Sequence, residues 1–84
     1  MIVKTHFVEH PNGIIAVADI EPQQAMDQTV AASLGRRLSA KLGGLPALLR
    51  CRIGSAFFFH GDASLYRYGV DPMIDALPIV EIDV

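Results

Sequence analysis

The amino-acid sequence predicts an α+β fold: a two-layer sandwich in which one helix packs on a four- to five-stranded, mainly antiparallel sheet, in the order β-β-α-β-β-β. Three observations predict it. An Asn-Gly pair separates two apolar stretches at the start, a stripe of apolar residues at helical spacing follows, and the second half returns to short apolar stretches broken by Gly, Asp and Pro. The 84 residues make a single domain over positions 1–84, with a core of modest size.

The first two elements are predicted to form a β-hairpin. Residues 2–8 mix β-branched, aromatic and polar side chains as strands do, and residues 14–20 form the returning strand. Between them, Pro11-Asn12-Gly13 contains an Asn-Gly pair, which is a strong short-range signal for a hairpin turn. Gly13 supplies a positive φ angle there without a steric penalty.

A helix is predicted next. Pro22 suits its first position, because the missing N–H of proline would have no helical partner there. Apolar side chains recur every four residues at Met26, Val30, Leu34, Leu38 and Leu42. Such a stripe drifts by about 40° per step around a helix of 3.6 residues per turn, which suits a helix that crosses a twisted sheet. Gly43-Gly44 then ends the helix.

The second half of the chain is predicted to contain three strands. Residues 47–60 form one long strand, and residues 64–70 form its hairpin partner after a turn. Asp71-Pro72 ends that partner strand, since proline has no N–H for the ladder. A helical turn at 73–77 and a final strand at 79–84 complete the chain.

Side-chain alternation along residues 47–60 predicts two different faces. The helix-facing set is apolar and consists of Leu49, Cys51, Ile53, Phe57 and Phe59. The opposite face carries Arg50, Arg52, Phe58 and His60, accompanied from the next strand by either Tyr66 and Tyr68 or Leu65 and Arg67. Because one helix covers only one face of a sheet, these residues are the predicted binding surface, and arginine and aromatic residues are the types enriched in interface hot spots. Two alternatives stay open: later residues of the chain cover this face, or a second copy of the protein does.

The histidines do not predict a metal site. His6 and His10 lie on the same side of the first predicted strand, but four strand residues span about 13 Å, and metal ligands lie about 2 Å from their ion. We therefore expect His6, His10 and His60 to be surface or turn residues, with no metal and no cofactor.

No catalytic group is predicted either. Cys51 is expected to be a buried structural thiol, because alternation sends Arg50 and Arg52 to the face opposite its sulfur, where they cannot stabilise a thiolate. Asp62 and Ser64 lie close to His60 in sequence, but both are ordinary turn residues, and neighbours in one turn rarely converge as a catalytic triad does. We expect a protein that is not an enzyme.

Charge and cysteine content narrow the function classes. The net charge is −2, which argues against a generally basic, nucleic-acid-binding surface. Six of the seven basic residues nevertheless lie in the middle of the chain: Arg36, Arg37, Lys41, Arg50, Arg52 and Arg67. A single cysteine excludes an internal disulfide and predicts a cytoplasmic location, as does the absence of a signal peptide or a membrane-spanning stretch.

The sequence thus predicts a small, non-enzymatic protein-binding module: an adaptor or inhibitor of a larger intracellular protein. Its size is also typical of small inhibitors that phages and mobile elements encode. The contacts would come from the helix-free sheet face or from an exposed strand edge. The alternatives are a nucleic-acid-binding module that uses the mid-chain Arg and Tyr residues, and a structural homodimer. An enzyme or a small-ligand binder ranks last.

Overall fold

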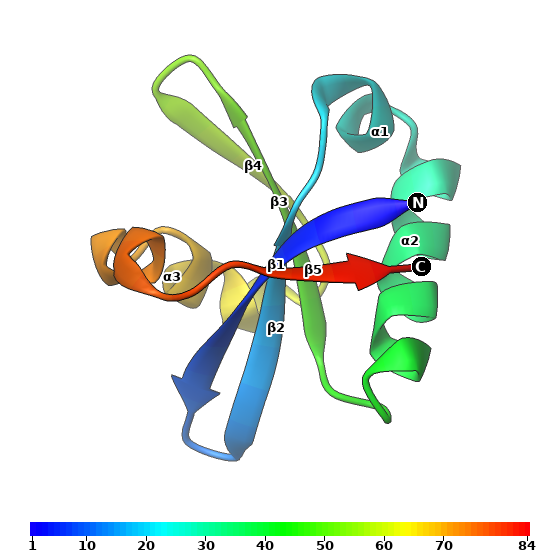
Figure 1. Ribbon diagram of the computed structural model, residues 1–84. Coiled ribbons are helices and arrows are strands. Elements are labelled where there is room, and N and C mark those ends of the chain that lie inside the picture. Colours follow the sequence, from blue (N-terminus) through cyan, green and yellow to red (C-terminus); the bar gives the residue numbers. More distant parts are fainter.

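A computed structural model describes all 84 residues as one five-stranded sheet with helices on both faces (Figure 1). The strands are β1 (Ile2–His10), β2 (Gly13–Asp19), β3 (Ala47–Ile53), β4 (Ala56–His60) and β5 (Val80–Asp83). Their order across the sheet is β4-β3-β2-β1-β5. The α+β class is confirmed, but the sheet is mixed, since β2 and β3 are parallel. The helical crossover between them brings the chain back to the end of the sheet where β2 begins, so that β3 runs in the same direction as β2.

The N-terminal hairpin is confirmed. β1 pairs antiparallel with β2, from Lys4 opposite Asp19 to His10 opposite Gly13. Gly13 has a φ of 130°, a backbone conformation that residues other than glycine rarely adopt. β5 pairs antiparallel with the outer side of β1 and closes that end of the sheet.

The crossover contains two helices where one was predicted: α1 (Pro22–Met26) and α2 (Gln28–Lys41). Asp27 between them is extended, and its side chain accepts hydrogen bonds from the first backbone N–H groups of α2, so α2 begins with a cap of its own. This restart separates Met26 from the apolar stripe, and Met26 is exposed. Val30 is exposed as well, because α2 turns the neighbouring Ala31 toward the sheet in its place. α2 packs on the sheet through Ala31, Leu34 and Leu38.

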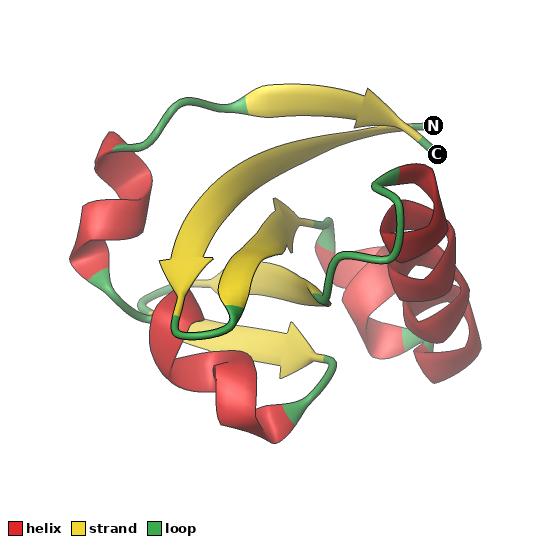
Figure 2. Cartoon of the chain, turned by 90° about the horizontal axis from the view of Figure 1, so that it is seen from below, coloured by secondary structure: helices red, strands yellow, loops and turns green.

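The second sheet face is also covered. After β4 the chain forms three short helical turns, where a strand was predicted at 64–70. They are η1 (Ala63–Leu65), α3 (Tyr66–Gly69) and η2 (Pro72–Ala76). These turns lie on the side of the sheet opposite α2 (Figures 1 and 2) and bury Leu65 and Ile74 against it. The prediction of a helix-free face is therefore wrong, and of the two alternatives left open, later residues of the chain provide the cover.

Residues 47–60 form a hairpin, not one long strand. Gly54 and Ser55 make a two-residue turn between β3 and β4, and the φ of 62° at Gly54 is that of the first central residue of a type II′ turn. Residues on either side of such a turn point to the same face, so the alternation changes phase there. Phe58 and His60 consequently lie on the α2 side of the sheet, and Phe57 and Phe59 on the other side, the reverse of the prediction.

None of the helices combines the length and the apolar character that crossing a membrane requires.

Candidate functional site: the open edge of strand β4

The seven residues predicted to form one binding surface fall into three groups. Phe58 and His60 lie on the α2 side of β4, and Arg50 and Arg52 lie on the opposite side of β3. Tyr66, Arg67 and Tyr68 belong to α3, within the cover of that second face. The Tyr66 ring stacks on that of Phe59 with centroids 5.0 Å apart, so it contributes to the packing of this cover. The structure does not bring the seven residues together.

Arg50 is an internal clamp. Its residue exposure is only 5%, and its Nε donates a hydrogen bond of 2.7 Å to Oδ1 of Asp19. Nη2 donates to Oδ2 of Asp19 and to Oδ1 of Asp75, and Nη1 donates to the backbone carbonyl of Gly69. Burial opposes the charge of this guanidinium, but the hydrogen bonds and charges of Asp19 and Asp75 outweigh it and raise the pKa of Arg50. Arg50 thus ties the helical cover to the sheet, with its donors used inside the molecule.

Arg52 completes a neutralised polar cluster around this clamp. Its guanidinium lies over the ring of Phe57, 4.7 Å from the centroid, and 3.9 Å from Oδ2 of Asp75. A cleft of about 340 Å³ lies here, at the carboxyl ends of the parallel strands β2 and β3. Its lining contains two guanidinium groups and three carboxylates, those of Asp19, Glu21 and Asp75, so it offers no uncompensated positive charge to a ligand.

His6 is buried on the same face, so the expectation of a surface histidine is wrong for this residue. Its Nε2 lies 3.5 Å from Oδ2 of Asp19, and its Nδ1 has no hydrogen-bond partner. The phase of β1 places it there, because the residue opposite His6 is Val17, whose side chain packs with Leu65 and Ile74 of the helical cover. No three His, Cys, Asp or Glu side chains lie close enough together to hold a metal ion.

Strand β4 has an open outer edge. The carbonyl of Arg50 accepts a hydrogen bond from the N–H of Ile20, so the backbone of Arg50 faces β2, and the odd-numbered residues of β3 face β4. The partners of these odd-numbered residues, Phe58 among them, therefore point their backbone groups inward. The N–H and C=O groups of Phe57 and Phe59 point outward, where no further strand lies.

The composition of this edge is unusual. Proteins protect edge strands with charged residues, with proline or by making them very short. β4 has the sequence Ala-Phe-Phe-Phe-His, without a charged carboxylate, lysine, arginine or proline. The opposite edge, β5, has four residues that include Glu81 and Asp83, and the N-terminal amino group binds the Asp83 carboxylate, which lowers its pKa. Of the two edge strands, β4 is the one without charged residues.

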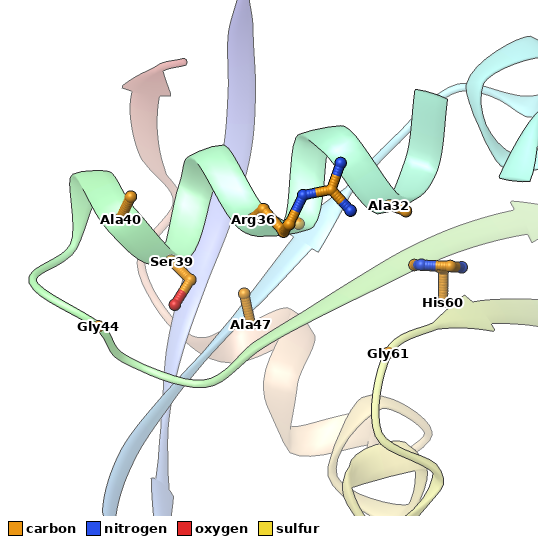
Figure 3. Close-up of a pocket in the computed structure, with 9 residues that line it drawn as sticks. Ala32, Arg36, Ser39, Ala40, Gly44, Ala47, His60 and Gly61 are labelled. Atoms are coloured by element: carbon orange, nitrogen blue, oxygen red, sulfur yellow. The ribbon is translucent and has the colours of Figure 1, made fainter. Parts of the chain in front are cut away.

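A groove of about 540 Å³ runs between α2 and β4 beside this edge (Figure 3). Small residues form most of its lining: Ala32, Gly35, Ala40, Gly44, Ala47 and Gly61. Arg36 and Ser39 of α2 and His60 of β4 are its polar members. Phe58 precedes His60 on the same face of β4, and its residue exposure of 54% is high for a phenylalanine. The groove and the exposed Phe58 ring thus lie on the same face of the sheet, at its open β4 edge.

Cys51 lies beneath this surface as the buried thiol that the sequence predicts. Burial, and after it the charges of Glu21 and Asp19, raise the pKa of its thiol. We expect the native protein to react with a thiol reagent such as Ellman's reagent at least about 100-fold more slowly than the urea-unfolded protein, since only an exposed thiolate attacks it. Rapid, complete labelling of the native protein would show that Cys51 is accessible and would contradict this assignment.

No protein family, no curated protein and no solved structure matches this chain.

Proposed function

We propose that the protein is a non-enzymatic protein-binding module that takes an extended segment of its partner as an added strand along β4. The open, uncharged edge of β4 carries this proposal. In strand addition, main-chain hydrogen bonds provide affinity, and pockets for alternate side chains provide specificity. The outward backbone groups of Phe57 and Phe59 can form these main-chain hydrogen bonds, and the groove beside α2 can serve as a side-chain pocket.

Phe58 is the expected anchor of this interface. Its residue exposure is 54%, and it lies on the same face of β4 as His60 of the groove, the face toward which a partner strand would direct every second side chain. Burying an exposed aromatic ring against a partner removes a large apolar area from water, and such residues often dominate binding energy. The edge therefore replaces the helix-free face as the proposed contact surface.

The partner would be a larger intracellular protein, for which this module acts as an adaptor or an inhibitor. A cytosolic location is supported by the single cysteine, which has no disulfide partner. The nucleic-acid alternative is weaker, because Arg50 donates its hydrogen bonds within the protein. The other mid-chain basic residues are divided among α2, which carries three of them, β3 and α3. A homodimer would form by pairing of two β4 edges.

Selection of displayed random peptides on the immobilised protein tests the proposal. We expect extended peptides to be enriched, and we expect Phe58→Ala to weaken their binding by about 10-fold or more. Ile79→Ala is the matched control, because Ile79 has a similar exposure of 57% and immediately precedes β5, at the opposite edge of the sheet. Amide shifts on peptide binding should be concentrated in residues 56–60.

Two results would contradict the proposal. One is a selection that enriches no peptide, and the other is a set of peptides whose affinity is the same for Phe58→Ala and the unchanged protein. Light scattering over a wide concentration range covers the homodimer: a stable dimer that Phe58→Ala dissociates would mean that a second copy, not another protein, occupies β4.

A further inference from the structure

The groove between α2 and β4 has an uncompensated positive character. Arg36 lies on the helix wall and His60 on the strand wall, and their side chains border the same space (Figure 3). No carboxylate is among the nine residues that line it. Arg36 makes no side-chain hydrogen bond and no ion pair with the rest of the chain, which leaves the five N–H donors of its guanidinium free. The other arginine-rich cleft differs, since Asp19 and Asp75 neutralise it.

Strand addition would bring one partner side chain to this position. Directly opposed side chains on one face of neighbouring antiparallel strands have Cβ atoms about 4.5–5.5 Å apart. The side chain of His60 is on the α2 side of β4, so the partner residue opposite His60 would also direct its side chain to that side. There it would lie beside the imidazole and beneath the helix that carries Arg36.

We infer, on the basis of the proposed function, that the partner segment carries an aspartate or glutamate at this position, and that Arg36 and His60 bind its carboxylate. A guanidinium is suited to this task because its planar donors match the two oxygens of a carboxylate. The small residues of the groove leave room for the acidic side chain and for the guanidinium to turn onto it. The imidazole of His60 adds a second donor from the opposite wall.

The peptides obtained by selection on the unchanged protein provide the test. We expect an acidic residue at one fixed position, and we expect its change to Asn or Gln to weaken binding by about tenfold. When the protein carries Arg36→Gln, the same change in the peptide should have little effect on affinity, because the guanidinium that binds the carboxylate is already lost. Arg37→Gln is the matched control: Arg37 is the next residue of α2, is also exposed to solvent, and does not line the groove. It should leave the preference for an acid unchanged.

The possible failures are distinguishable. Two outcomes would overturn the acidic partner and leave strand addition standing. In the first, the selected peptides require Phe58 but share no acidic residue at a fixed position. In the second, changing the acidic residue to its amide weakens binding equally for Arg36→Gln and for the unchanged protein. A lack of Phe58-dependent peptides would overturn both the acidic partner and strand addition. A dimer through β4 would also overturn the acidic partner, since β4 contains no carboxylate.

Discussion

Replacement of Asp19 by alanine is expected to lower the free energy of unfolding by about 3–5 kcal/mol, a large share of the roughly 5–15 kcal/mol that stabilises a typical domain. The reason is the charge that it leaves behind. Arg50 is buried, and Asp19 accepts two of its four hydrogen bonds, including the shortest, at 2.7 Å. Without this carboxylate, a buried guanidinium keeps only one contact with Asp75 and one with the carbonyl of Gly69.

Asp75→Ala is the matched comparison. Asp75 contacts the same guanidinium, but through a single hydrogen bond of 3.2 Å, and its side chain is 55% exposed against 37% for Asp19. An ion pair with so exposed a carboxylate contributes little, and Arg50 would retain both bonds to Asp19, so we expect a loss of only about 1 kcal/mol or less. The two variants remove the same chemical group from the same cluster and differ mainly in burial.

Urea unfolding measures both losses, and a difference of 1 kcal/mol corresponds to a shift in Tm of about 4–8 °C for a domain of this size. Native-state hydrogen exchange adds a local readout. Because Arg50 ties residues 63–77 to the sheet, the amides of this segment should lose more protection in Asp19→Ala than those of β1. If Asp19→Ala does not fold, Asp19→Asn keeps the shape and loses the charge. Equal losses for the Asp19 and Asp75 variants would contradict the clamp.

Local signals predicted the N-terminal hairpin and the α+β class correctly. The turn at Pro11-Asn12 and the positive φ of Gly13 depend only on residues adjacent in the chain. The burial of Cys51 also followed from the sequence, since side-chain alternation places it on the apolar face of its strand with Leu49, opposite Arg50 and Arg52. Such features need no knowledge of which elements meet in space.

The candidate site could not be located correctly, because it depends on the phase of one short strand. A single two-residue turn at Gly54-Ser55 reverses the faces of Phe57, Phe58, Phe59 and His60. A signal for this turn was present, since a Gly-Ser pair between two apolar stretches is typical of a hairpin. Without it, Phe58 and His60 were placed on the same face as Arg50 and Arg52, and the open edge of β4 was not recognised.

The helical cover was missed for a different reason. Residues 64–70 alternate and contain two tyrosines, which favours a strand in isolation. Two aspartates decide otherwise: the side chain of Asp62 accepts a hydrogen bond from the N–H of Ser64, and that of Asp71 does the same for Met73. The burial of hydrophobic residues from these turns against the sheet then outweighs the strand preference.

Alanine at position 69 is expected to destabilise the protein by about 1–3 kcal/mol, although alanine favours helices over glycine by up to about 1 kcal/mol. Gly69 ends α3 directly above the sheet. A Cβ atom there would overlap Cε1 of Phe59 and would lie 2.9 Å from Cζ of the same ring and 3.0 Å from Cδ2 of Leu48. Leu48 is fully buried, and the Phe59 ring is held by its stack on Tyr66, so neither side chain can yield cheaply.

Gly35→Ala is the control for this substitution and should have the opposite sign. Gly35 lies in the middle of α2, where an added Cβ would meet only Cδ1 of Leu49, at an ordinary contact distance of 4.0 Å. We therefore expect Gly35→Ala to stabilise the protein by about 0.5–1 kcal/mol through helix propensity alone. Both changes are measured by urea unfolding. In a Phe59→Leu background, which removes the overlapping ring, Gly69→Ala should lose most of its effect. A Gly69→Ala protein as stable as the unchanged one would mean that the helical cover is not pressed against the sheet at this point.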